Sequence, residues 1–286
     1  VSINDSDSTG HILIDSTNDA ILFTGENGSL YQPVYGSDDD LVLYLPFSEN
    51  LINISNTTYD RSPYGNDGTL VGMNKGDQIL NGNVTGWTPG KYGNAMGFDG
   101  NDDFINVSYV SLFGNEFTRS FWVKTNVDTF GKAIFYYDTK GDNNNRNFVE
   151  LTAGGAVRSQ ITSSDGLTVN EVDGTTDVTD NQWHYVVDTW DGTTHSLYID
   201  GVLDVPAETP SITMTNTERQ LAIGIRHDAM SQPWNGSIDE VMIYKRALKP
   251  EEIRTHYLRG SGYGASGAIT ADKFRIVNTS GSRTME

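Results

Sequence analysis

The sequence predicts an all-β protein of antiparallel strands, with one short helix near residues 250–258 and extra strands at both termini. Three observations lead to this prediction. Between Ser237 and Tyr244 apolar residues occupy alternate positions, which is the period of a strand with one buried face. Two Asp-Gly pairs, at 191–192 and 200–201, each separate two alternating segments, as in two tight hairpins in series. After the last of these strands the pattern becomes helical.

The start of this helix is well marked. Pro250 is tolerated in a first turn, and Glu251 and Glu252 lie where the positive end of the helix dipole favours acids. Ile253 and Tyr257 then recur at helical spacing. The helix therefore follows the last strand of the predicted sheet directly.

Composition restricts the classes of function. The chain has 286 residues, of which 36% are hydrophobic, enough for one substantial core with appended ends. With 19 basic and 38 acidic residues its net charge is −19, which argues against a nucleic-acid partner, because phosphates require basic patches. Cysteine is absent, so no disulfide can stabilise the fold.

Eight Asn-x-Ser/Thr triplets occur along the chain. Such triplets mark exposed loops in exported proteins that carry N-linked glycans. They favour an extracellular location, on a cell surface or a virion surface.

An ordered series of motifs carries a family resemblance. It comprises Trp-His-Tyr-Val at 183–186, Leu-Tyr-Ile-Asp-Gly at 197–201, Trp-Asn-Gly-Ser-Ile-Asp-Glu-Val-Met-Ile-Tyr at 234–244 and Glu-Glu-Ile at 251–253. The series resembles the laminin-G-like and pentraxin-like domains of the concanavalin A-like lectin/glucanase superfamily, over roughly residues 41–257. This resemblance implies an antiparallel jelly-roll β-sandwich.

Three regions are expected along the chain. Residues 1–40 form a strand-bearing extension, residues 41–259 the laminin-G-like jelly roll, and residues 260–286 a Gly-rich hinge followed by a C-terminal strand. Because an isolated hairpin is marginal in water, the terminal strands need a partner. They could add to strands of a neighbouring subunit, giving a homo-oligomer, or pack on their own domain.

Within the jelly roll the elements follow in order. Leu41–Phe47 is an apolar strand, and residues 91–107 form a hairpin whose turn contains Asp99-Gly100. Asp102 or Asp103 is expected to bind loop amides rather than a ligand. Phe117–Lys124 is a central strand with aromatic residues in the core.

A loop rich in turn residues spans Asp60–Thr69. The resemblance implies that this loop holds a structural Ca²⁺ through Asp60 and Asp67, completed by Asp239 from the strand at 237–244. Oxygen ligands on a turn suit this cation. The alternative is that Asp60 only caps the turn through the backbone.

The stretch Ala133–Val149 is the richest in polar residues. The resemblance to pentraxins implies a ligand-face calcium site, in which Asp142, Asn143 and Asp228 match the family pattern. Arg226 replaces a Glu of that pattern, and a guanidinium cannot ligate Ca²⁺. A metal-free polar site is therefore the alternative. The candidate ligand-binding residues are Tyr137, Asp138, Asp142, Asn143, Arg226, Asp228 and Trp234.

No catalytic site is predicted. Jelly-roll glucanases of this architecture carry a Glu-x-Asp-x-x-Glu strand, which places carboxylates on one face. Here the corresponding strand has only Asp239 and Glu240, which simple alternation would place on opposite faces.

The leading hypothesis is a non-catalytic extracellular module that binds glycans or a glycosylated cell-surface partner through the rim loops of the jelly roll. A second hypothesis is a structural subunit of a surface filament or of a viral tail or capsid appendage, with the terminal strands making the subunit contacts. An atypical glycan-cleaving enzyme is a third.

Overall fold

The structure is a computed structural model, and it describes residues 39–47, 56–73, 78–80, 83–112, 115–138, 146–214, 217–226, 231–260, 275–278 and 281–284. The chain forms two compact units, one of residues 39–258 and one of residues 1–38 with 259–286. In the second unit β18 (Arg275–Asn278) pairs with β19 (Gly281–Thr284) as an antiparallel hairpin. The predicted N-terminal strands lie outside the described residues, and strand exchange between subunits stays a prediction.

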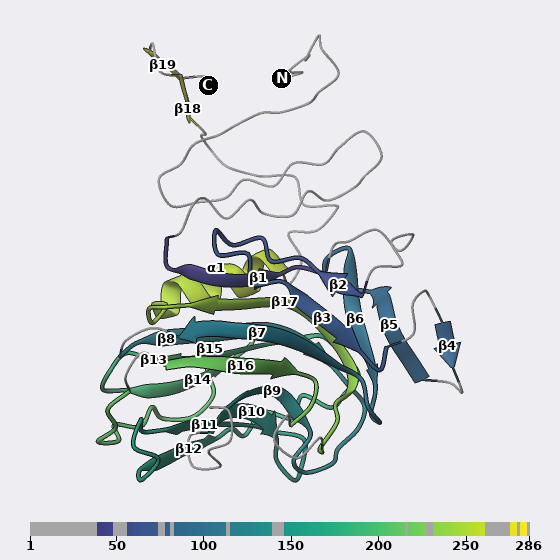
Figure 1. Cartoon of the computed structure of the whole chain (residues 1–286). Coiled ribbons are helices and arrows are strands. Elements are labelled where there is room, and N and C mark those ends of the chain that lie inside the picture. The colour runs from purple at the N-terminus through teal and green to yellow at the C-terminus, as the bar shows by residue number, and fades with distance from the viewer. Residues whose placement is uncertain are drawn as a thin grey trace. The chain divides into compact units, whose positions relative to one another are not determined.

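The larger unit is a sandwich of two antiparallel sheets, which confirms the predicted jelly-roll fold class (Figure 1). Across the described residues, the first sheet has the order β15 (Val202–Leu203), β14 (His195–Ile199), β13 (His184–Trp190), β8 (Phe117–Lys124), β17 (Asn235–Tyr244), β6 (Asn94–Asp99), β5 (Asn83–Pro89) and β4 (Gln78–Leu80), and β1 (Leu41–Leu45) also pairs with β17. The second has the order β12 (Val169–Asp173), β11 (Val157–Thr162), β10 (Asn147–Leu151), β9 (Ala133–Asp138), β16 (Thr217–Ile223), β7 (Phe104–Leu112), β3 (Gly68–Val71) and β2 (Thr57–Thr58).

Both Asp-Gly pairs form the hairpins that the sequence predicts. The first joins β13 to β14 and the second joins β14 to β15. Asp200 and Gly201 have φ angles of 52° and 76°, and two consecutive positive φ angles are what a two-residue hairpin turn with the right twist requires.

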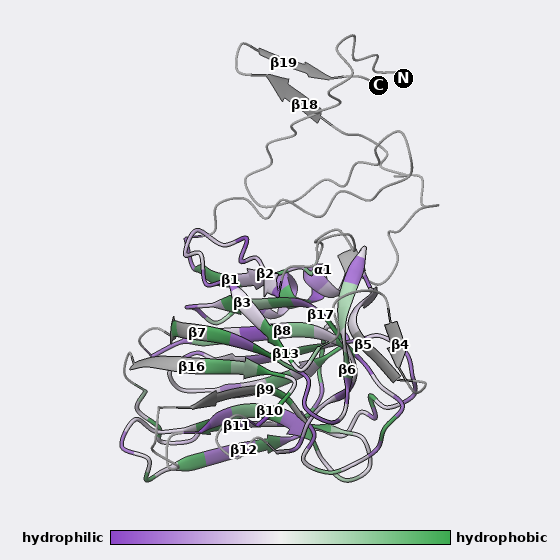
Figure 2. Cartoon of the chain, turned by 45° about the vertical axis from the view of Figure 1, so that its right-hand side comes forward, coloured by the Kyte–Doolittle hydropathy of each residue, from purple (hydrophilic) through white to green (hydrophobic). Residues whose placement is uncertain are grey.

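The core lies between the sheets and is built from alternate strand residues. Figure 2 shows hydrophobic and hydrophilic positions alternating along strands such as β7 and β12. In β12 Asn170 and Val172 are buried while Val169, Glu171 and Asp173 are exposed. The inward residues form one apolar cluster that includes Leu43, Leu45, Phe121, Val123, Phe135, Val149, Val186, Ile223, Trp234, Ile238 and Val241.

The predicted helix is present as α1 (Pro250–Gly260). Ile253 is fully buried, and the ring of Tyr257 stacks on Trp122 of β8 with 5.8 Å between centroids. The helix therefore covers aromatic residues on the outer face of the first sheet. Among the described residues, no helix is long and apolar enough to cross a membrane.

A buried polar network joins the two sheets inside the sandwich. Arg119 on β8 donates from Nε to Oδ2 of Asp188 on β13 at 2.6 Å, and both side chains are fully buried. The ring of His195 on β14 has Nε2 2.8 Å from Oδ1 of Asp188 and 3.0 Å from Oγ of Ser159, and Nδ1 2.5 Å from Oδ1 of Asn170. Since Ser159 and Asn170 belong to β11 and β12, the network spans both sheets.

Strand β17 contains a bulge that corrects one expectation. Its register with β8 shifts between Asp239 and Met242, and Glu240 has a φ of 51°. Ile238 and Val241 both enter the apolar core, so the extra residue leaves Asp239 and Glu240 both turned away from it. The expectation that these two carboxyl groups point to opposite faces is therefore wrong.

Both acids of the bulge are buried and have protein donors. Asp239 accepts from the backbone N–H groups of Lys91 at 2.8 Å, Tyr92 at 3.0 Å and Glu240 at 2.8 Å. The hydroxyl of Tyr44 donates to Oε2 of Glu240 at 2.7 Å. Burial raises the pKa of Asp239 to about 8 against the effect of its three donors. Burial and the neighbouring Asp239 raise the pKa of Glu240 well above its ordinary value.

Replacing Asp188 should destabilise the protein strongly. Asp188→Asn leaves the Arg119 guanidinium buried without its counter-charge, and breaking a buried pair in this way costs roughly 3–5 kcal/mol. The matched control is Asp173→Asn, which removes the acid of an exposed Arg–Asp pair and should cost about 1 kcal/mol or less. Urea unfolding near pH 7 measures both, and equal losses would contradict a structural role for the network.

The stability difference between the wild type and Asp188→Asn should depend on pH because of the pKa of Asp188. Burial alone would raise its pKa, but the charges of Arg119 and His195 and the hydrogen bonds of His195 and Ser159 hold it at about 2, below the ordinary 3.8. The ionised carboxylate therefore stabilises the fold above about pH 4, and this contribution is lost as the pH falls toward 2. The gap between the wild type and Asp188→Asn should narrow over that range.

Glu240→Gln should make the stability of the protein fall less steeply as the pH rises above about 5. The folded state holds the Glu240 proton to a higher pH than the unfolded chain does, so the wild type loses stability as the pH rises above 4.5, the ordinary pKa of this group. Each pH unit in that window is worth up to about 1.4 kcal/mol. Unfolding free energies of Glu240→Gln and of Glu116→Gln, an exposed control, provide the measurement. Parallel pH curves for the wild type and Glu240→Gln would refute the prediction.

Candidate functional site

The structure describes only part of the predicted ligand site. Asp142, Asn143 and Asp228 lie outside the described residues. Tyr137 and Asp138 end strand β9, where the backbone alone is described. The predicted site is therefore judged from strand register and from the two remaining residues, Arg226 and Trp234.

The register separates the two stretches that were expected to form one rim. Asp138, at the end of β9, pairs with Gln220, whereas Phe135 pairs with Ile223. The chain reaches Arg226 only after Ile223, beyond the opposite end of this antiparallel pair. The structure therefore does not bring the Asp138 end of β9 next to Arg226.

Trp234 lies in the core and cannot serve as a sugar platform. Its side chain is fully buried and belongs to the apolar cluster between the sheets. Its indole Nε1–H is also buried and has no hydrogen-bond partner among the described residues. Stacking on a sugar ring requires an accessible aromatic face. This corrects the expectation for Trp234, which arose because a Trp between turn residues also fits an exposed loop.

Arg226 follows β16 and acts on a neighbouring acid. Its backbone forms an isolated bridge with Ser231, with N to O distances of 3.0 and 3.3 Å. Its side chain is half-buried, and its charge acts on Glu150 of β10. Burial raises the pKa of Glu150, while Arg158 and Arg226 oppose that rise.

Glu150 belongs to a cross-strand row that the sequence analysis missed. It pairs with Arg158 of β11, and Arg158 pairs in turn with Asp173 of β12. Arg158 donates from Nε to Oδ1 of Asp173 at 2.5 Å and from Nη2 to Oδ2 at 2.9 Å, and its Nη1 lies 3.4 Å from Oε2 of Glu171. The bond from Arg158 lowers the pKa of Asp173. A carboxylate held ionised in this way is poorly suited to act as a general acid.

An aromatic ring and an amide extend this row. Phe130 is 55% exposed, and its ring centroid lies 5.9 Å from the guanidinium carbon of Arg158. Gln160 pairs with Glu171 in the next row. We call this surface the β10–β12 face, made up of Phe130, Glu150, Arg158, Gln160, Glu171 and Asp173.

The signal for this face was present in the sequence. Asn170-Glu-Val-Asp173 alternates an amide or apolar residue with an acid, and the neighbouring strand carries Arg158 and Gln160 two positions apart. Alternate residues of a strand share one side. What the sequence alone did not supply was the register that places Arg158 opposite Asp173.

The loop predicted to hold calcium is closed by its own donors. Oδ1 of Asp60 accepts from the N–H groups of Tyr44 and Ser62, both at 2.8 Å. Oδ2 accepts from the Ser62 hydroxyl at 2.6 Å and the Asn66 N–H at 2.7 Å. Asp67 accepts from the N–H of Asp60 at 2.9 Å. Capping of the turn by Asp60 is thus what the structure shows.

Calcium at Asp60, Asp67 and Asp239 stays a prediction. The buried carboxylate of Asp239 does not need a cation to compensate its burial, because three backbone N–H groups donate to it. To coordinate an ion, these carboxylates would have to give up some of the hydrogen bonds that they accept.

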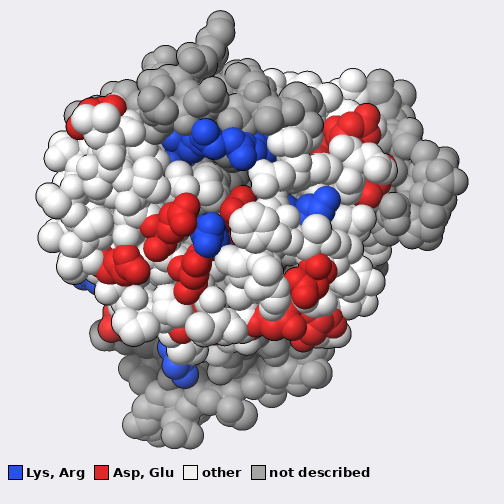
Figure 3. Space-filling view, turned by 90° about the horizontal axis from the view of Figure 1, so that it is seen from below, with Lys and Arg blue, Asp and Glu red and all other residues white. Residues whose placement is uncertain are grey.

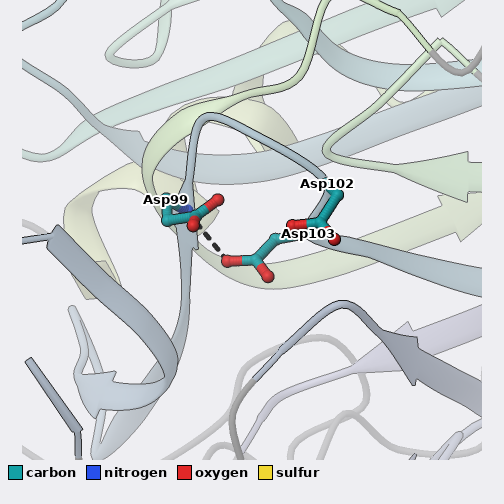
Figure 4. Close-up of side chains that lie close together, drawn as sticks. All are labelled: Asp99, Asp102 and Asp103. Atoms are coloured by element: carbon teal, nitrogen blue, oxygen red, sulfur yellow. Dashed lines mark hydrogen bonds between the residues drawn. The ribbon is translucent and has the colours of Figure 1, made fainter. Parts of the chain in front are cut away.

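Another acidic group lies in the turn between β6 and β7. The carboxyl oxygens of Asp99, Asp102 and Asp103 come within 4.8 Å of one another (Figure 4). Asp103 is buried, and its Oδ2 accepts from the N–H of Asp99 at 2.9 Å. The expectation that Asp102 or Asp103 bonds to a loop amide is confirmed for Asp103.

Comparison with known proteins gives the family and the fold. A model of the concanavalin A-like lectin/glucanases superfamily matches residues 99–254. No curated protein sequence matches the chain significantly. Several solved structures share the fold at low sequence identity.

Domain 4 of AbnA, a GH43 extracellular arabinanase from Geobacillus stearothermophilus, was solved in complex with arabinotriose. It has a TM-score of 0.56 and 22% identity, and the match covers 75% of this chain and 97% of that domain. The binding domain of Paraclostridial Mosquitocidal Protein 1 has a TM-score of 0.56 and 17% identity, covering 78% of this chain and 52% of the other.

The botulinum neurotoxin serotype G binding domain has a TM-score of 0.57 and 14% identity, and the match covers 82% of this chain and 54% of that domain. This chain thus spans about half the length of the two toxin domains. Since the family model covers more than half of the sequence, the chain belongs to the concanavalin A-like lectin/glucanases superfamily.

Proposed function

We propose that this chain is a non-catalytic, extracellular module that binds glycans, and that the β10–β12 face takes part in binding. The superfamily includes lectins, and a structural neighbour was solved with arabinotriose while others are named as receptor-binding domains. The observation that carries the proposal is the combination on one face of the exposed ring of Phe130, the exposed carboxylates of Glu171 and Asp173 and the part-exposed guanidinium of Arg158, with Glu150 and Gln160 buried beside them.

Sugars present both hydroxyl groups and apolar C–H faces. The exposed ring of Phe130 can contact a C–H face, while Glu171 and Asp173 can accept hydrogen bonds from hydroxyls. The two bonds between Arg158 and Asp173 fix both side chains before a ligand arrives. Such preorganisation reduces the entropy lost on binding.

The acids that most resemble a catalytic pair are inaccessible. Asp239 and Glu240 have the raised pKa values typical of catalytic acids, yet both are fully buried. Their oxygens bind the backbone of Lys91 and Tyr92 and the hydroxyl of Tyr44. A glycosidic bond cannot reach them, so their chemistry supports the fold and favours a binding function over hydrolysis.

Removing the aromatic ring should weaken glycan binding. A glycan array would identify ligands, and calorimetry would then compare the wild type with Phe130→Ala. Loss of a ring that stacks on a sugar should raise Kd by about tenfold, equivalent to about 1.4 kcal/mol. The control is Val202→Ala, which removes an equally exposed apolar side chain from β15 in the other sheet.

Two results would count against the proposal. One is an array without any glycan ligand. The other is a ligand whose affinity falls equally in Phe130→Ala and Val202→Ala, or in neither. The second result would leave a glycan module whose binding face lies elsewhere.

A further inference from the structure

We infer that the β10–β12 face selects neutral, hydroxyl-rich glycans and rejects glycans that carry carboxylate or sulfate groups. This inference rests on the proposed function and specifies its ligand class.

The donors of Arg158 are already committed within the protein. Nε and Nη2 form a bidentate pair with Asp173, and Nη1 contacts Glu171. Proteins recognise ligand carboxylates and sulfates best with an arginine fork whose donors are free. Although Arg158 is the central cation of this row, an anionic ligand would have to displace both acids to use it.

The face as a whole is acidic. Glu150, Glu171 and Asp173 surround Arg158, and Arg226 is the further cation that acts on Glu150. The side chains of Glu171 and Asp173 are 40% and 53% exposed, more than the 21% of Arg158. An approaching ligand therefore meets acceptors before donors, and such a surface favours ligands that bring hydroxyl donors.

The net charge of the chain acts in the same direction at longer range. A net charge of −19 repels polyanions before contact. Figure 3 shows, on the face viewed from below, acidic side chains around a central basic group, with a band of basic side chains along the upper part of the same face. Neutral glycans are unaffected by this field, so charge discriminates between the two classes without lowering the affinity of the neutral one.

The test uses probes that differ in charge but hardly in size. Linear arabinan, xylan and a β-glucan would each be carboxymethylated, and part of each product would be converted to its methyl ester. For any backbone that binds, the neutral ester should have a Kd at least about tenfold lower than the charged form, on the scale of like-charge repulsion across a few contacts. Raising the salt from about 0.05 to 0.5 M should narrow this gap by weakening the repulsion and leave the ester unaffected.

A double variant separates charge from mere loss of structure. Glu171→Gln with Asp173→Asn removes two charges and frees the donors of Arg158. Because both carboxylates are also proposed acceptors for ligand hydroxyls, the variant should weaken binding of both probes, and the informative quantity is the ratio of the two affinities. Affinity for the charged probe relative to the ester should rise by about threefold per carboxylate removed, as expected for charges roughly 7 Å apart in water. Glu116→Gln, an exposed acid that precedes β8, is the control and should alter neither affinity.

The outcomes are distinguishable. If the wild type binds the charged form as tightly as the ester, this inference is overturned, while the proposed glycan-binding function stands. A double variant whose discrimination equals that of the wild type also overturns it, because the selectivity would then come from elsewhere. Binding of neither form of any backbone, together with an empty array, overturns the proposed function and this inference with it.

Discussion

The sandwich depends on how β17 shares one of its edges. Strand β8 pairs with one edge of β17. The other edge pairs with β6 up to Ile238 and with β1 from Val241 onward. A strand cannot pair continuously across such a joint, and the bulge at Asp239 and Glu240 lies within it. Buried backbone N–H groups require acceptors. The side chain of Asp239 is the acceptor for the backbone N–H of Lys91, in the turn between β5 and β6. A side chain therefore accepts a hydrogen bond at the joint, where strand pairing is interrupted.

Packing on the outer side of the first sheet decides which surface is left for a ligand. On the outer side of the first sheet Trp122 and Tyr185 are buried, and Tyr257 of α1 stacks on Trp122. That region is occupied by the protein itself. The second sheet has exposed acids and Phe130 around β10–β12. Inside the sandwich the pair of Arg119 and Asp188 and its neighbours tie the two sheets together, so the face is carried on a rigid support.

The sequence predicted the fold well because local signals agreed with one another. The strand at Ser237–Tyr244, the turn at Asp200-Gly201 and the helix start at Pro250 each depend on nearby residues and are all present, although a bulge interrupts the alternation within that strand. The site was harder to predict because it depends on register. Nothing local distinguishes a buried Trp234 from an exposed one, and nothing local reveals that one extra residue in β17 moves Glu240 to the side of Asp239.

The carboxylates of this protein show why residue type alone did not locate the site. Asp239 and Glu240 lie in a fully buried joint, where loss of solvent raises their pKa values and protein donors occupy their oxygens. Glu171 and Asp173 keep contact with water, and Arg158 compensates their charge. Because Asp239 and Glu240 are desolvated, their oxygens hold strands together through protein donors. Because Glu171 and Asp173 are solvated and beside a fixed counter-charge, they remain able to accept hydrogen bonds from a ligand. Burial, which strand register determines, separates the structural acids of this fold from the acids that we propose for ligand binding.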